Sequence, residues 1–202
     1  MVIGITGSFG VGKTTVANMF RQLGEEVIDA DQVAHMIVRP RTSAYRQIIA
    51  CFGKKILVGV YISRKRLARE AFSDKKKLKR LDKIMHPKIL RIIKGKIKKI
   101  SSKDILVIDA ALLIESGLLP WIDRLVVVKS KSEIQMQRLK KIGLTVNEMK
   151  RRINAQLSQD EKVGFADFII DNSNGRKKTK RQVREIWNKI SEDVAYGALR
   201  AT

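Results

Sequence analysis

The stretch GSFGVGKTT, residues 7 to 15, decides how the rest of the sequence is interpreted. It fits the pattern G-x-x-x-x-G-K-[ST], whose fixed positions are filled by Gly7, Gly12, Lys13 and Thr14. The β-branched run at residues 2–6 predicts a buried strand, and apolar residues at helical spacing after the motif predict a helix that ends at Gly24. A strand, a glycine-rich turn and a helix direct backbone N–H groups toward a phosphate. The sequence therefore predicts a phosphate-binding loop (P-loop) rather than a turn without a ligand.

Two side chains of the motif have expected contacts with a nucleotide. In such a loop Lys13 reaches the β- and γ-phosphate oxygens, and the hydroxyl of Thr14 binds Mg²⁺. Motors, GTPases, translocases and small-molecule kinases share this loop, so it does not identify the reaction. The sequence contains no [NT]KxD guanine signature, which leaves a GTPase without support.

Length and composition indicate one domain with an inserted subdomain. The chain has 202 residues, of which 44% are hydrophobic, enough for a full core. The first strand is too short for a signal peptide, and no apolar run approaches a membrane span. Cys51 is the single cysteine, which excludes an internal disulfide and fits a reducing compartment. We therefore expect a cytoplasmic protein with no membrane partner.

Positive charge is concentrated in one segment. The chain has 42 Lys and Arg against 20 Asp and Glu, a formal charge of +22. Residues 54–103 hold 19 basic side chains against three acidic ones. Such a stripe can attract nucleic acid, but its only aromatic residues are Tyr61 and Phe72, which gives no stacking ladder. A lysine-rich exterior is the favoured interpretation, steering of a phosphorylated substrate is the second, and nucleic-acid binding stays open.

The pattern of apolar residues predicts a three-layer α/β fold with a helical insertion. Residues 25–31, EEVIDAD, predict a second strand that ends in two carboxylates, followed by a helix over residues 32–38. Residues 42–103 are predicted to be mostly helical, with a new element starting at His86-Pro87. Buried-strand patterns return at residues 105–109, 124–128 and 168–170. The predicted core is thus residues 1–41 and 104–202, and the predicted insertion is residues 42–103.

Carboxylates are predicted at the sheet edge that carries the P-loop. Because parallel strands end at a common edge, the strand-terminal Asp29, Asp31, Asp109 and Asp171 should lie there together. Asp109 is placed to hold Mg²⁺ through water. Asp31, two residues of extended chain beyond the strand and so within roughly 7 Å of its end, could meet the hydroxyl of a second substrate. Asp29 could equally be a helix cap. Together with the P-loop, these residues favour phosphoryl transfer to an alcohol.

A cationic helical hairpin is predicted at about residues 132–156. Two helices flank a turn at Gly143 and Thr145, and they carry Arg138, Lys140, Lys141, Lys150, Arg151 and Arg152. Such a hairpin could be a lid that closes over the transferred phosphate and excludes water. A solvated helical hairpin would show the same spacing.

Five stretches, taken in order, resemble one known family. They are GITGSFGVGKTTVANMFRQLGEEVIDADQVAH, IMHPKI, VIDAALLIESGL, RINAQLSQDEK and ADFIIDNSNGRKKTKRQV. They resemble dephospho-CoA kinase over about residues 1–190. The resemblance implies a P-loop kinase core with a helical substrate-binding insertion and a helical lid. It also implies transfer of phosphate from ATP to the ribose 3′-hydroxyl of dephospho-CoA, the last step of coenzyme A synthesis.

The resemblance implies a role for each matching residue. The expected ATP-binding residues are Gly7, Gly10, Val11, Gly12, Lys13, Thr14, Thr15, Arg138 and Asn172, the last beside adenine. The expected catalytic residues are Asp31, Lys13 and Arg138. The expected substrate-binding residues are Asp31, Arg64 and His86. Arg152 supports the lid, and Thr14 and Asp109, the latter through water, hold Mg²⁺. His86 precedes a proline and could equally be a helix-start cap.

The sequence departs from the family pattern in three places. A proline is usual at Ala111, and an aspartate is usual at Ser63. The lid is one residue shorter around Lys140, Lys141 and Ile142, where a second arginine is usual, so either a lysine replaces that arginine or the contact is absent. Two other classes stay open: a nucleoside or nucleotide kinase, and a basic P-loop ATPase stimulated by nucleic acid. The oligomeric state is also open.

Overall fold

The computed structural model describes residues 1–101 and 104–200, with side chains to residue 196. The strands are β1 (Val2–Thr6), β2 (Glu26–Asp29), β3 (Leu57–Val58), β4 (Tyr61–Ile62), β5 (Leu106–Asp109), β6 (Arg124–Lys129) and β7 (Phe168–Asp171). The α-helices are α1 (Lys13–Gln22), α2 (Ala30–Ile37), α3 (Ser43–Phe52), α4 (Arg64–Ala71), α5 (Lys75–Ile97), α6 (Ser132–Lys141), α7 (Val146–Asn154), α8 (Gln159–Val163) and α9 (Arg176–Arg200). Two 3₁₀ turns, η1 and η2, span Lys54–Ile56 and Leu119–Trp121.

The chain forms two compact units. The first, here the core unit, comprises Met1–Ile28 and Ile97–Thr202, and the second, here the helical unit, comprises Asp29–Lys96. The predicted insertion boundaries at residues 42 and 103 stay a prediction, and residues 102, 103, 201 and 202 of the predicted segments lie outside the described residues. Each unit has its own apolar core.

A five-stranded sheet organises the core unit, with the order β2-β5-β1-β6-β7. β1 pairs in parallel with β5 and β6, and β6 pairs in parallel with β7. In this register Ile5 lies opposite Asp109, and Lys129 lies opposite Asp171. The carboxyl ends of β1, β5, β6 and β7 therefore share one edge, as predicted, and this α/β architecture confirms the predicted fold class.

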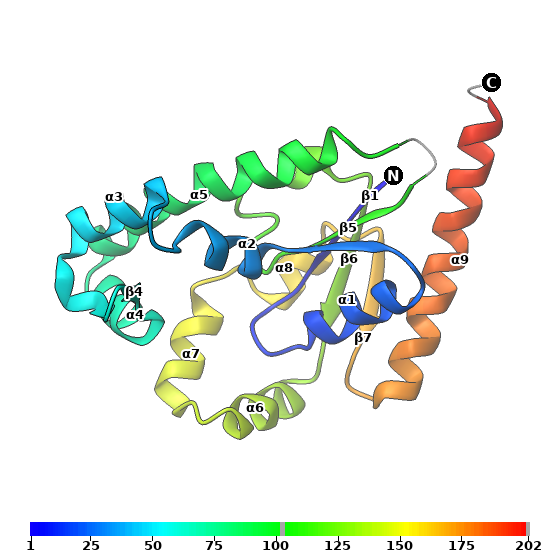
Figure 1. Cartoon of the computed structure of the whole chain (residues 1–202). Helices are drawn as coiled ribbons and strands as arrows, with labels where there is room; N and C mark the ends of the chain where they lie inside the picture. The colour runs from blue at the N-terminus through cyan, green and yellow to red at the C-terminus, as the bar shows by residue number, and fades with distance from the viewer. Residues whose placement is uncertain (102–103, 201–202) are drawn as a thin grey trace. The chain divides into compact units, whose positions relative to one another are not determined.

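Helices α1 and α9 cover one face of the sheet (Figure 1). Ile3 and Ile5 of β1 pack in one cluster with Val16 and Phe20 of α1 and with apolar residues of α9. Gly4 points to the other face, where a Cβ would lie 2.7 Å from Leu113. Since both faces are covered, all five residues of β1 are buried, which explains its continuous apolar sequence.

The helical unit differs from the prediction in two places. A short hairpin, β3 and β4, interrupts the helices, with Leu57 opposite Ile62. In addition, α5 runs unbroken through Pro87, so the prediction that a new element starts at His86-Pro87 was wrong. Proline removes the N–H that would bond the carbonyl of Lys83. Both residues are exposed, so water can satisfy that carbonyl and the helix continues.

Among residues 1–101 and 104–200, no helix combines the length and the apolar character that crossing a membrane requires.

Candidate functional site

The predicted P-loop joins β1 to α1 in the core unit. Gly12 precedes the first helical residue and has φ 94° and ψ 32°, a left-handed conformation that glycine adopts readily. Gly12 has no side chain that could cap α1, and the first turn of α1 carries no acidic residue. The positive end of α1 thus suits an anion.

The loop lysine and the two threonines after it begin α1. Lys13 is half-buried, and its Nζ donates a hydrogen bond to the carbonyl of Ser8 at 3.2 Å. Thr14 and Thr15 are exposed in the first turn of α1. The motif residues predicted to bind ATP phosphates therefore occupy one contiguous loop and helix start.

Two predicted site residues, Arg138 and Asn172, make hydrogen bonds to the backbone of this loop. Arg138 donates from Nη1 to the carbonyl of Val11 at 2.9 Å and from Nη2 to the carbonyl of Asn172 at 2.7 Å. Asn172 is 5% exposed, donates from Nδ2 to the same Val11 carbonyl at 2.8 Å, and accepts from Thr179 at 2.9 Å. A Cβ at Gly12 would lie 2.2 Å from Asn172 Nδ2. Arg138 and Asn172 therefore fix the loop backbone, and the expected place of Asn172 beside adenine stays a prediction.

Gln135, which the sequence pattern did not single out, also supports the loop. Its side chain is buried, and Nε2 donates to the carbonyl of Phe9 at 2.6 Å and to the hydroxyl of Ser8 at 3.3 Å. Gln135 precedes Arg138 by three residues on α6, so both lie on one helical face. That spacing was a usable signal once Arg138 had been singled out.

The predicted cationic hairpin forms as α6 and α7. Thr145 and Glu148 make a reciprocal capping box that starts α7, and the bonds from Thr145 lower the pKa of the Glu148 carboxyl. Arg152 of α7 places its guanidinium carbon 5.2 Å from the ring centroid of Phe9, a cation–π contact with the P-loop. The hairpin predicted at residues 132–156 thus contacts the loop through both of its helices.

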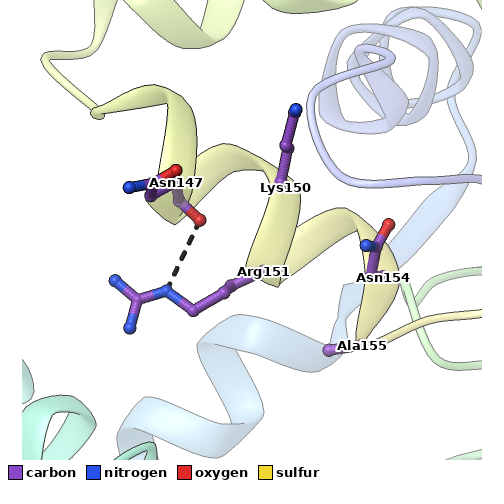
Figure 2. Close-up of a pocket in the computed structure, with 5 residues that line it drawn as sticks. All are labelled: Asn147, Lys150, Arg151, Asn154 and Ala155. Atoms are coloured by element: carbon purple, nitrogen blue, oxygen red, sulfur yellow. Dashed lines mark hydrogen bonds between the residues drawn. The ribbon is translucent and has the colours of Figure 1, made fainter.

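One face of α7 lines an open pocket of about 600 Å³. Its lining residues are Asn147, Lys150, Arg151, Asn154 and Ala155. Figure 2 shows Arg151 folded back toward Asn147, whose carbonyl accepts from Nε at 3.4 Å, while Lys150 extends away from it. Two cations and two amides give this face the chemistry to bind an anionic group.

Asp109 lies at the carboxyl end of β5 and is 6% exposed. Two residues later, the carbonyl of Ala111 accepts a hydrogen bond at 3.2 Å from the hydroxyl of Thr6, which directly precedes the P-loop. No cluster of three His, Cys, Asp or Glu side chains suited to a metal occurs within residues 1–101 and 104–200. Magnesium is commonly held by one or two carboxylates together with phosphate oxygens and water, which fits the single carboxylate of Asp109 beside a phosphate-binding loop.

Asp29 caps α2, which begins at Ala30 rather than at Gln32. The Asp29 carboxylate accepts from the N–H groups of Asp31 at 2.8 Å and Gln32 at 3.1 Å. Asp31 therefore lies in the first helical turn, and the prediction of an extended chain from Asp29 to Asp31 was wrong. The cap alternative for Asp29 is confirmed.

Asp31, Arg64 and a missed residue, His35, interact within the helical unit. His35 follows Asp31 by four residues on α2. Burial lowers the pKa of the His35 imidazole, the Arg64 guanidinium lowers it further, and the carboxylates of Asp31 and Asp29 oppose this. The i, i+4 spacing in DADQVAH was the signal for His35. His86 lies inside α5, so the helix-start alternative for it was wrong.

Comparison with known proteins gives a consistent family. The family model described as dephospho-CoA kinase matches residues 1–178. The chain is 37% identical over 192 residues to the dephospho-CoA kinase of Aquifex aeolicus, covering 95% of this chain and 98% of the relative. It is 40% identical over 190 residues to that of Geobacillus kaustophilus, covering 92% and 94%. The solved dephospho-CoA kinase of Campylobacter jejuni superposes with a TM-score of 0.72 at 26% identity, covering 95% and 98%. The chain therefore belongs to the dephospho-CoA kinase family.

Proposed function

We propose that Lys13, Arg138 and Asp31 carry the reaction of this family in this chain. The reaction is ATP-dependent phosphorylation of the ribose 3′-hydroxyl of dephospho-CoA, which yields coenzyme A and ADP. The observation that carries the proposal is a P-loop between β1 and α1 in a chain whose residues 1–178 match the family. Shared folds host many reactions, so this combination, and not the fold alone, supports the proposed reaction.

The core unit binds ATP. The N–H groups of Gly7 to Thr15 bind the phosphates, and Lys13 stabilises charge on the β- and γ-oxygens during transfer. Arg138, already bonded to the loop carbonyl of Val11, is close enough to the loop to neutralise phosphate charge. Arg152, stacked on Phe9, supports the hairpin of residues 132–156 as a lid over the reacting phosphate.

The core unit also has a set of oxygens suited to Mg²⁺. The hydroxyl of Thr14 on the first turn of α1 and the carboxylate of Asp109, through water, would hold the ion. When bound, Mg²⁺ neutralises charge on the β- and γ-phosphate oxygens. β5 pairs directly with β1, which brings Asp109 and the P-loop to the same edge of the sheet and supports the assignment.

The helical unit binds the acceptor. Asp31 accepts a hydrogen bond from the 3′-hydroxyl and orients it, because a loose phosphoryl transfer needs positioning more than base strength. Arg64 interacts electrostatically with the same helix and supplies a cation for the phosphates of dephospho-CoA. His86 is the third proposed contact with this substrate. We also place the protein in the cytoplasm, which localisation of the tagged chain in cells would test.

A coupled ADP-release assay tests the proposal. We expect ADP release to depend on dephospho-CoA, and not on nucleosides, nucleotides, DNA or RNA at equal concentration. Product analysis should show phosphate on the ribose 3′-oxygen. Turnover that depends on a nucleoside would favour the nucleoside kinase, and ATP hydrolysis stimulated by DNA or RNA with a steep salt dependence would favour the basic ATPase.

A further inference from the structure

Lys162 on α8 is a fully buried cation that neither the loop nor the lid explains. Its side chain is 0% exposed, and Nζ lies 2.9 Å from Glu115 Oε1 and donates to the carbonyl of Ala111 at 2.5 Å. Lysine is very rarely fully buried, and then it is paired, because removing the ammonium from water is costly. A position of this kind needs a reason beyond packing.

The two partners of Lys162 connect three functional segments. The Ala111 carbonyl also accepts from Thr6, which is buried and ends β1 immediately before Gly7. Ala111 follows Asp109 by two residues. Glu115 Oε1 also accepts from the N–H of Leu157 at 3.0 Å, in the connection that leaves α7. One ammonium thus joins the entry to the P-loop, the segment after Asp109 and the base of the hairpin.

We propose that Lys162 is a positioning residue for phosphoryl transfer, which holds the segment after Asp109 in register with the P-loop and with the base of the lid. The inference rests on the proposed function of that site. Lys162 does not act on the reacting atoms. It acts through the Ala111 carbonyl and the Glu115 carboxylate, which fix the segment 110–116 that follows the proposed Mg²⁺ carboxylate.

The contacts predict a selective kinetic effect. The P-loop itself is held by Gln135, Arg138 and Asn172, and none of the hydrogen bonds described for these side chains involves Lys162. Loss of the ammonium leaves Glu115, whose side chain is 22% exposed, without its buried partner. It also removes one of the two hydrogen bonds that the Ala111 carbonyl accepts. ATP binding by the loop should persist, whereas the alignment of Asp109 at the transition state should be lost.

The test compares Lys162→Met with Lys189→Met, which removes an exposed lysine of α9 by the same chemical change. At a temperature where both are folded, Lys162→Met should lower kcat by about 10- to 100-fold, the range for residues that orient a metal ligand. The KM for ATP should stay within about threefold, the Mg²⁺ concentration for half-maximal rate should rise, and amides 110–116 should exchange hydrogen faster than in Lys189→Met. A purely structural role would lower thermal stability without lowering kcat at a nearly constant KM for ATP.

Other outcomes would overturn the inference. One is a folded Lys162→Met variant whose kcat lies within threefold of the kcat of the parent protein. The other is a loss of ATP affinity as large as the loss of kcat. If Lys162→Met does not fold, Glu115→Gln decides, since the amide oxygen can still accept from Leu157 while the charge is removed. An unchanged kcat and unchanged exchange in Glu115→Gln would then refute the role. Hydrogen exchange does not depend on turnover, and the parent protein's rate with dephospho-CoA tests the proposed function separately.

Discussion

The contact between Gly12 and Asn172 gives a prediction whose size follows from the structure. In Gly12→Ala, the new Cβ would lie 2.2 Å from Asn172 Nδ2, far inside van der Waals contact. Asn172 is buried and short, so its side chain must rotate away and lose the bonds to Val11 and Thr179. Two such bonds contribute about 1–3 kcal/mol together, at about 0.5–1.5 kcal/mol each.

Gly24→Ala is the matched control for this prediction. Gly24 has φ 103°, close to the 94° of Gly12, but no heavy atom lies within 4 Å of a Cβ there. Alanine in a left-handed conformation costs about 1–2 kcal/mol at either position, so this cost cancels in the comparison. We expect Gly12→Ala to have a free energy of unfolding about 1–3 kcal/mol below that of Gly24→Ala.

Urea unfolding followed by tryptophan fluorescence measures the difference, and the ADP-release assay measures its effect on turnover. If the loop loses the same free energy at the transition state, kcat falls about 5- to 150-fold in Gly12→Ala. Gly24→Ala should retain near-parental kcat. Equal free energies of unfolding in the two variants would show that Asn172 does not hold the loop.

Four further predictions concern three proposed catalytic residues and the interaction between His35 and Arg64. Lys13→Ala should lower the rate of phosphoryl transfer by several orders of magnitude, because the charge on the β- and γ-oxygens loses its stabilising ammonium; a loss below tenfold would place the chemistry elsewhere. Arg138→Lys should lower kcat at least about tenfold, since one ammonium cannot replace a guanidinium fork that bonds two carbonyls 2.9 and 2.7 Å away, and an equal kcat in the two proteins would remove its role. Asp31→Asn should keep ATP affinity, measured by calorimetry, and lose about 10²-fold or more in turnover, whereas normal turnover or lost ATP binding would remove Asp31 from this role. The imidazole of His35 should titrate below pH 6.5 by NMR, and Arg64→Gln should raise that pKa. Because the folded-state pKa of His35 lies below its unfolded-state pKa, the stability contributed by the neutral imidazole is present above the unfolded-state pKa and is lost as the pH falls through the folded-state pKa. A titration midpoint at or above 6.5 would contradict this prediction.

The sequence was most informative where local pattern and burial agree. β5 and β6 were found as continuous apolar runs because both faces of the sheet are covered, which leaves no alternation for solvent to impose. The P-loop was found because its backbone geometry requires particular residues at fixed positions, such as Gly12 in its left-handed conformation. Asp29 was correctly predicted at a strand end, but its side chain caps α2, which begins at the next residue. Asp31 therefore lies in the first turn of α2 and not in the extended chain that was predicted.

Other features depended on contacts between distant segments, which spacing does not encode. The β3–β4 hairpin has two residues in each strand, too few for a periodic signal. Lys162 follows an acidic capping box in a polar stretch, and nothing local separates it from an exposed lysine. Its burial follows from its contacts with Glu115 and Ala111, about fifty residues earlier in the chain. Pro87 was wrongly predicted to start a new element, because the free-energy cost of a proline inside a helix depends on whether water can reach the carbonyl that loses its hydrogen bond.

The central position of β1 has a consequence for how the protein is made. Val2 pairs with Leu106 and Ile3 with Arg124, so β1 leaves the ribosome well before the two strands that pair with it in the sheet. At about 5–20 residues per second, β1 waits roughly 5–20 s for β5 to be synthesised. During that interval an apolar strand with unpaired edges is open to association with other nascent chains. The helical unit has its own apolar cluster, contained within residues 38–85, so we expect it to be compact on the ribosome before the nucleotide-binding sheet can close.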